Sequence, residues 1–249
     1  MKRILWILGF MALGYAFVPS QPDATEIVRR SEEKLRGESS KATIQIKIVR
    51  PSWSRTLEAK TWSKGTDYSM ILITAPARDQ GTVFLKRDKE IWNWVPNIER
   101  TVKLPPSMMM QSWMGSDFNN DDLIQESSLV KDYTHKLLGE KNIRGLDCWV
   151  IEFDPKEGAP VVWDRIVAHI SKDEYLQLKS EFYDEEGDLI NVLEGFDVKE
   201  MDGRKLPSRL RMTPVDKEGQ YTEMKYGNLE FGIDVSESFF TTQNMKRVR

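Results

Sequence analysis

Short apolar runs with a period of two recur along most of this sequence, and they constrain its fold more than any other feature. Ile44, Ile46 and Ile48 alternate with Gln45 and Lys47, which is the pattern of a strand with one buried face. Further runs of this kind are separated by turn-forming segments such as "RGLD", "SKDE", "EEGD" and "DGRK". The pattern predicts a mainly β chain of about eleven to thirteen strands joined as antiparallel hairpins.

A single sheet of that many strands must curl, because strand twist prevents a flat sheet of this size. A sheet closed or half-closed around an apolar interior either fills the interior with side chains or holds a ligand there. Two helices are predicted to cover the open side. One spans residues 23–36, with Asp23 or Thr25 as N-cap and Gly37 as its stop. The other spans residues 120–128 and begins at Asn120 or Asp121.

The first twenty residues have the pattern of a secretory signal peptide. Lys2 and Arg3 precede an apolar run from residue 4 to residue 18, which is shorter than the roughly 20 residues that cross a bilayer as a helix. Cleavage after Ala16 or after Ser20 fits the small residues there. We expect residues 21–249 to form one exported domain, because no linker interrupts the strand pattern.

The charge balance disfavours anionic partners. Without Lys2 and Arg3 the 36 basic residues fall to 34, against 39 acidic residues, a net charge of −5. Binding to nucleic acid or to an anionic membrane surface requires a positive footprint, so neither is expected. Cys148 is the single cysteine, which excludes an internal disulfide.

No pattern in the sequence indicates catalysis, a metal or a cofactor. His135 and His169 lack partners at metal-ligand spacing, and Cys148 has the apolar neighbours of an inert thiol. The segment "DFNNDD" resembles the start of a calcium loop, but positions 122 and 128 lack the glycine and glutamate of an EF-hand. We therefore expect a protein that is not an enzyme.

The candidate site is apolar. Two tryptophans in "EIWNWV" share one face of a strand, where they either fill the core or line a cavity wall. The methionines that follow Pro105 and Pro106 either fill gaps in the core or form a mobile loop that adapts to apolar cargo, and we favour the loop. Aspartate at Trp94 or Met109 is then expected to abolish lipid uptake. The candidate cavity residues are Trp92, Trp94, Met108, Met109, Trp113, Met114 and Phe118.

The segment "GTVFLKRDKEIWNWVPNIERTVKLPPSMMMQSWMGSDFNNDDL", residues 81–123, resembles the LolA-like family of outer membrane lipoprotein-sorting proteins. The segments "EFYDEEGDL" and "FFTTQNM" are similar to the same family. The resemblance implies an incomplete, half-open antiparallel β-barrel with helices at its mouth. It also implies a hydrophobic cavity that takes the acyl chains of a lipoprotein or another lipid across the periplasm.

The resemblance further implies an inner-membrane exporter of the ABC or RND type as donor and an acceptor on the outer membrane. The alternative is a periplasmic lipid-sensing module that acts by binding a regulatory protein, and an enzyme with a barrel cavity is a third possibility without a supporting motif.

Overall fold

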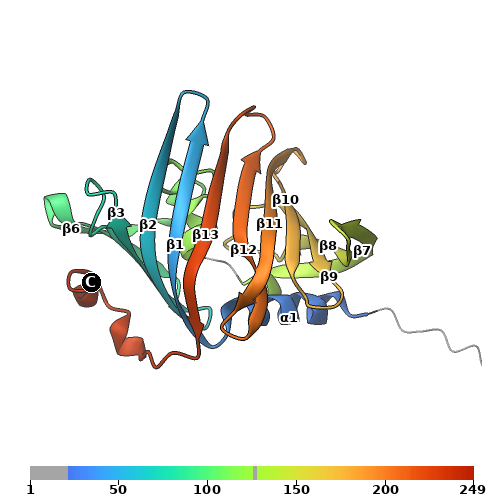
Figure 1. Ribbon diagram of the computed structural model, residues 1–249, viewed down its shortest axis with the longest axis horizontal. Coiled ribbons are helices and arrows are strands. Elements are labelled where there is room, and N and C mark those ends of the chain that lie inside the picture. Colours follow the sequence, from blue (N-terminus) through green and yellow to red (C-terminus); the bar gives the residue numbers. More distant parts are fainter. Residues whose placement is uncertain (1–21, 126–127) are drawn as a thin grey trace, which may run out of the picture.

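The structure is a computed structural model that describes residues 22–125 and 128–249, so the predicted signal peptide lies outside the described residues (Figure 1). Within this part of the chain thirteen strands form one sheet. The strands are β1 (Ser39–Arg50), β2 (Trp53–Lys64), β3 (Tyr68–Ala75), β4 (Val83–Arg87), β5 (Glu90–Val95), β6 (Arg100–Leu104), β7 (Tyr133–Ile143), β8 (Leu146–Pro155), β9 (Arg165–Ser171), β10 (Gln177–Tyr183), β11 (Leu189–Met201), β12 (Arg204–Pro214) and β13 (Tyr221–Phe231).

The sheet consists of two meanders that are joined in the middle. Its order is β6-β5-β4-β3-β2-β1-β13-β12-β11-β10-β9-β8-β7, and each neighbouring pair is antiparallel. The joint is the pairing of β1 with β13, in which Ile46 lies opposite Met224. Among the described residues β6 and β7 each pair on one side only, so the sheet does not close. The predicted half-open antiparallel fold and the strand number are confirmed.

Period-two alternation determines which side chains face the core. In β1, Ile44, Ile46 and Ile48 are buried while Gln45 and Lys47 are exposed, as the sequence predicts. We call the face with these isoleucines the inner face. Its side chains form the larger of two hydrophobic clusters, and each fully buried aliphatic side chain there stabilises the fold by roughly 1.5–3 kcal/mol.

Helix α1 (Ala24–Arg36) covers one end of the inner face (Figure 1). The Asp23 carboxylate accepts a hydrogen bond from the Thr25 N–H, and the helix ends at Gly37, whose φ of 65° suits glycine. Ile27 and Val28 are buried against the main cluster. The predicted caps of this helix are therefore confirmed.

The connection between β6 and β7, residues 105–132, links the two edge strands of the sheet. In Figure 1 its green segments lie behind β1 and β2. Where one helix was expected at 120–128, the structure has a π-helix, η4, and a short α-helix, α2, with Ser128 as its N-cap. The short helices of the connection are η2 (Pro106–Met108), η3 (Trp113–Gly115), η4 (Asp121–Gln125) and α2 (Leu129–Asp132), while η1 (Pro96–Ile98) lies between β5 and β6.

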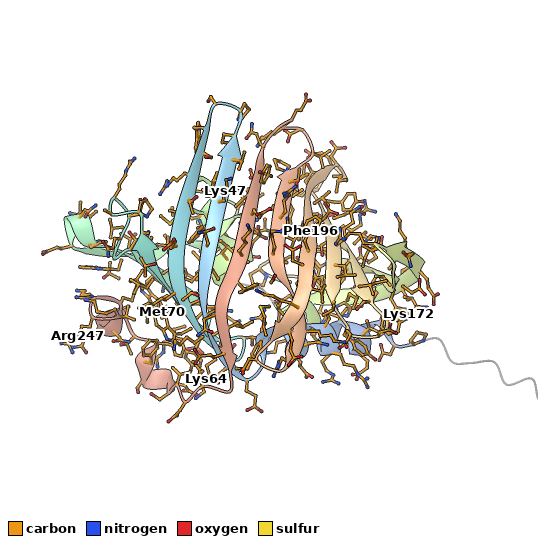
Figure 2. All side chains as sticks on the ribbon, in the orientation of Figure 1. Lys47, Lys64, Met70, Lys172, Phe196 and Arg247 are labelled. Atoms are coloured by element: carbon orange, nitrogen blue, oxygen red, sulfur yellow. The ribbon has the colours of Figure 1, made fainter. Side chains whose placement is uncertain are left out.

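The C-terminal segment, residues 232–249, packs on the outer face of β2 to β5. It contains η5 (Glu237–Phe239) and α3 (Thr242–Met245) and forms the second hydrophobic cluster with strand residues such as Met70. The rings of Trp62 and Phe239 lie 5.5 Å apart in this cluster. Figure 2 shows Met70 and Arg247 in the same region of the molecule. The segment thus shields apolar side chains that the curled sheet would otherwise expose.

Candidate functional site

A cavity of about 290 Å³ lies between the inner face of the sheet and its covers. This volume is close to the lower end of the range of small-molecule sites, roughly 300–1,000 Å³. Strands β1 to β3 and β9 to β13 form its wall together with Tyr133 at the start of β7, while α1 and the connection close it. Its apolar lining includes Leu35, Ile44, Ile71, Trp163, Phe182, Leu193, Leu210, Met212 and Met224.

Trp113 and Phe118 bring the connection to the cavity. Both side chains line it, and Trp113 is fully buried with its ring 5.4 Å from that of Phe84 on β4. The backbone N–H of Trp113 donates to the Phe118 carbonyl at 2.9 Å, and Ser112 forms an isolated β-bridge with Asn119. The two aromatic residues are therefore held side by side in one tight loop.

This loop is fastened to the central strands by a buried ion pair. Arg50 at the end of β1 lies 3.0 Å from the Asp117 carboxylate, and its guanidinium also donates to the Gly115 carbonyl at 2.9 Å. Thr222 on β13 donates its hydroxyl to Asp117 at 2.7 Å and accepts from the Asp117 N–H at 2.9 Å. The joint between the two meanders is thus also the anchor of the cavity cover.

The acidic half of the loop folds onto the methionine half. The Asp121 N–H donates to the Met109 carbonyl at 3.2 Å, and the Asn120 amide donates to the Met108 carbonyl at 2.8 Å. Asn119 and Asp122 cap each other, since each side chain accepts from the backbone N–H of the other residue. The sequence predicted Asn120 or Asp121 as the N-cap of a helix here, but the side chain that accepts a backbone N–H at the start of η4 is that of Asn119.

Ionisable groups occur in the wall of the apolar cavity. Glu32 and Arg36 on α1 form an ion pair of 3.4 Å, and Asp121 and Asp122 lie on the connection. The Trp163 indole N–H donates to the Asp122 carboxylate at 3.2 Å. Burial raises the pKa of Asp122 to about 6, although hydrogen bonds from Asn119 and Trp163 act in the opposite direction.

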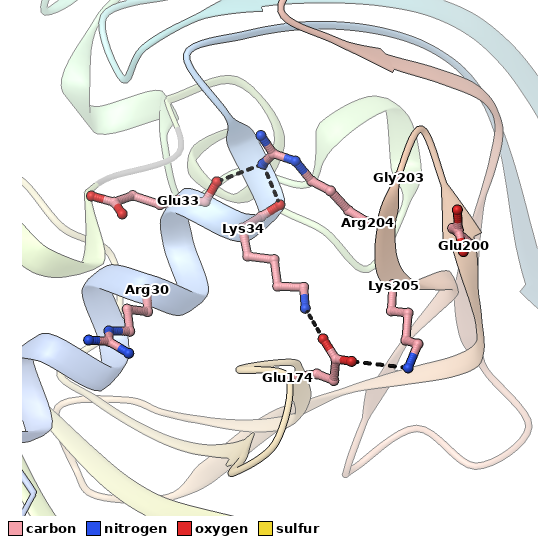
Figure 3. Close-up of a pocket in the computed structure, with 8 residues that line it drawn as sticks. All are labelled: Arg30, Glu33, Lys34, Glu174, Glu200, Gly203, Arg204 and Lys205. Carbon is pink, nitrogen blue, oxygen red and sulfur yellow. Dashed lines mark hydrogen bonds and ion pairs between the residues drawn. The ribbon is translucent and has the colours of Figure 1, made fainter.

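A second hollow, of about 530 Å³, lies outside the cavity, beside the C-terminal half of α1 (Figure 3). The Arg204 guanidinium donates to the carbonyls of Glu33 and Lys34 at 3.0 Å, which satisfies the last turn of the helix. Glu174 pairs with Lys34 and with Lys205, and these contacts lower its pKa. The charged residues of this hollow fasten α1 to the β9–β10 turn and the β11–β12 hairpin.

Residues 22–125 and 128–249 contain no group of three histidine, cysteine or acidic side chains that could hold a metal ion. No helix in these two ranges has the length and apolar character that crossing a membrane requires.

Comparison with known proteins gives the family. A family model described as "Uncharacterized protein" matches residues 65–247. The crystal structure of a DUF1329 family protein from Desulfovibrio piger is similar at 26% identity, over 89% of this chain and 97% of that chain, with a TM-score of 0.82. A LolA superfamily protein from Nitrosomonas europaea is 21% identical over 90% of this chain and 99% of that chain, with a TM-score of 0.78. The chain belongs to a LolA-like family.

Another similar structure comes from Vibrio parahaemolyticus and is described as an outer membrane lipoprotein-sorting protein domain. It is 24% identical over 90% of this LolA-like chain and 98% of that chain, with a TM-score of 0.81. None of the curated proteins compared with the chain matches it. The family that residues 81–123 predicted is therefore confirmed.

The structure divides the predicted site residues of this LolA-like chain into three groups. Trp113 and Phe118 line the cavity. Met109 is buried in the main cluster, and Met108 and Met114 pack against that cluster without lining the cavity in the described part of the chain. As the sequence predicted, the three consecutive methionines do not all face inward, because Met110 is 71% exposed.

Trp92 and Trp94 form the third group. They lie in the second cluster with the C-terminal segment, and Lys246 is 5.0 Å from the Trp94 ring centre. The same-face prediction is correct, but the shared face is the outer one. Neither residue is among the described residues that line the cavity.

Sequence reasoning missed most of the cavity wall. Met224 alternates with polar neighbours in β13, and that pattern could have indicated an inner position. Trp163 lies in a loop before β9, where no periodicity indicates its direction. Leu35 lies in the last turn of α1, a helix that the sequence predicted as a cover of the open side without indicating which of its residues contacts a cavity.

Proposed function

We propose that this chain is a carrier that holds the acyl chains of a lipoprotein or another lipid in the cavity under the sheet. The observation that carries the proposal is the cavity itself, with its apolar wall and its aromatic cover from Trp113 and Phe118. Support comes from the Vibrio parahaemolyticus neighbour, which is described as a lipoprotein-sorting domain. The proposal includes no catalytic step.

The physical task of such a carrier is to remove an acyl chain from water reversibly. Each buried methylene contributes about 0.8 kcal/mol, so a lipid anchor does not cross an aqueous compartment unaided. Trp113 and Phe118 line the cavity from the connection, and cargo would compete with them for the same apolar wall. This competition keeps net affinity below the gross burial energy, which permits release.

The proposed site of action is the periplasm. The predicted signal peptide, residues 1–20, would export the chain, and residues 21–249 would form a single carrier domain. An inner-membrane exporter of the ABC or RND type would supply the cargo, and an acceptor on the outer membrane would receive it.

The direct test is to purify the protein from its native envelope and to identify bound lipid by mass spectrometry. A second test measures uptake of the neutral fluorescent probe N-phenyl-1-naphthylamine by delipidated protein. Leu210→Trp narrows the cavity and should weaken uptake several-fold. Val215→Trp adds the same ring at an exposed position in the adjacent turn and should leave uptake unchanged. Lipid-free native preparations together with absent probe uptake would refute the carrier proposal.

A further inference from the structure

The cavity wall carries more polar character on one side than an apolar ligand requires. Its charged residues lie on the two covers of the cavity, with Asp121 and Asp122 on the connection and the ion pair of Glu32 and Arg36 on α1. Tyr133 also lines the cavity, and its pKa is raised by burial and by the nearby charges of both aspartates. These carboxylates therefore act on the interior of the cavity and not only on the helix that they begin.

Trp113 adds a hydrogen-bond donor to this polar side. Its side chain is fully buried and lines the cavity, yet the indole N–H has no hydrogen-bond partner among the residues that the structure describes. A buried donor without a partner costs roughly 1–3 kcal/mol. The bridge between Ser112 and Asn119 holds this indole next to the start of the acidic segment. An acceptor atom on a ligand would remove the cost.

The charges of the wall select the ligand. Among the described lining residues, three are carboxylates and Arg36 is the one guanidinium, a formal excess of two negative charges. Glu32 pairs with Arg36 and also accepts the Val130 N–H at 3.3 Å. The described lining therefore carries more negative than positive charge, which disfavours an anionic head group in surroundings of low dielectric constant.

We propose that the cavity binds a lipid at the junction of its acyl chain and head group, and that it selects neutral or cationic lipids with a carbonyl oxygen over anionic ones. Trp113 Nε1–H donates to the carbonyl oxygen, and Asp121 and Asp122 exclude a carboxylate or phosphate from the polar side of the cavity. This inference rests on the proposed carrier function and adds the class of cargo.

The test compares four probes of equal chain length in displacement of N-phenyl-1-naphthylamine at pH 7.5. The probes are dodecylamine, dodecanol, methyl dodecanoate and dodecanoate. We expect the Kd of dodecanoate to be at least about tenfold weaker than that of dodecylamine, because like charges repel strongly in a dry site. Equal affinities for these two probes would overturn the inference and leave the carrier function intact. Failure of every probe would instead refute the carrier function.

Variants locate the selection in the named residues. The double variant Asp121→Asn with Asp122→Asn should reduce the ratio between dodecanoate and dodecylamine to about threefold or less, mainly by improving dodecanoate binding. Asp216→Asn with Glu218→Gln makes the same change of charge in the exposed β12–β13 turn and should preserve the ratio. A ratio that survives in the first variant, with folding verified by circular dichroism, would assign the selection to other groups.

Trp113→Phe tests the donor separately. It removes the indole N–H and should weaken methyl dodecanoate about two- to tenfold, the range of one hydrogen bond. Dodecylamine has no acceptor when protonated, so its affinity should not change. Equal loss for both probes would show that the indole acts only by its bulk and would overturn this part of the inference.

Discussion

Arg50 and Asp117 form the contact that joins the cover of the cavity to the sheet, across 3.0 Å and with both side chains largely buried. Arg50 belongs to β1, and Thr222, which bonds the same carboxylate, belongs to the neighbouring β13. The cover is therefore held at the one place where the two meanders pair. Its release and the entry of cargo should be linked.

Breaking this contact should loosen the cover. Asp117→Asn removes the charge that faces Arg50 and should lower the free energy of unfolding by about 1–3 kcal/mol, since a buried guanidinium loses its counter-ion. Amide hydrogen exchange should accelerate in residues 113–118, and uptake of the neutral probe should become faster. Glu26→Gln on α1 breaks exposed ion pairs and should change neither the hydrogen exchange of residues 113–118 nor the rate of probe uptake. Unchanged exchange in residues 113–118 would contradict the anchoring role.

Two tryptophans should separate cavity function from outer-face stability. Trp113→Ala should destabilise the fold by about 3–5 kcal/mol and should also alter probe affinity, because the ring is buried against Phe84 and lines the cavity. Trp94→Ala should release the C-terminal segment at Lys246 and leave probe affinity unchanged. Limited proteolysis of the C-terminus and probe titration measure the two effects. Loss of uptake in Trp94→Ala would restore the cavity position that the sequence suggested.

Asp122 should make stability depend on pH. Its pKa is raised from 3.8 to about 6, so the folded state binds the proton more tightly than the unfolded state. Stability from this group is present below pH 3.8 and is lost as the pH rises through about 6. Asp122→Asn should therefore gain about 1–2 kcal/mol at pH 7.5 and much less at pH 4. Urea titrations at the two pH values measure the difference, and an equal effect at both would exclude a titrating carboxyl.

His135 should produce the opposite dependence. Its ring lies 2.8 Å from the Leu129 carbonyl of α2 and 3.1 Å from the Thr25 hydroxyl of α1, and burial lowers its pKa. The unfolded state then binds the proton more tightly, so stability is lost as the pH falls below about 6.5. Measured in the Asp122→Asn background, His135→Gln should reduce this acid-side loss, and His169, whose pKa burial also lowers, should account for part of the remainder. An unreduced loss would contradict the role of His135.

Local patterns predicted the parts of the fold that neighbouring residues determine. Alternation in β1 gave the inner face, and Asp23 and Gly37 gave the limits of α1, because capping depends on a few adjacent backbone groups. The common face of Trp92 and Trp94 follows from period two in the same way. Period two does not show whether that face is the inner or the outer one, because both faces of this part of the sheet are covered.

The remaining site depends on contacts between distant residues. Thr222 donates a hydrogen bond to Asp117, which is 105 residues away in the sequence, and Trp163 donates to Asp122, which is 41 residues away. No local pattern encodes either meeting. The resemblance of residues 81–123 to the LolA-like family indicated a cavity, but the polar side of that cavity depends on α1 and the connection, which only the folded chain brings together.

The connection begins at one edge strand of the open sheet and ends at the other edge strand, so it ties the two edges together across the open side. Its anchor at Arg50 divides it into two spans, one attached to β6 and one to β7. A ligand that displaces Trp113 or Phe118 on binding should therefore shift both edge strands of the sheet. The distance between the two edge strands and the position of the cover should therefore change together. A partner protein that binds either edge strand would then change the cavity as well.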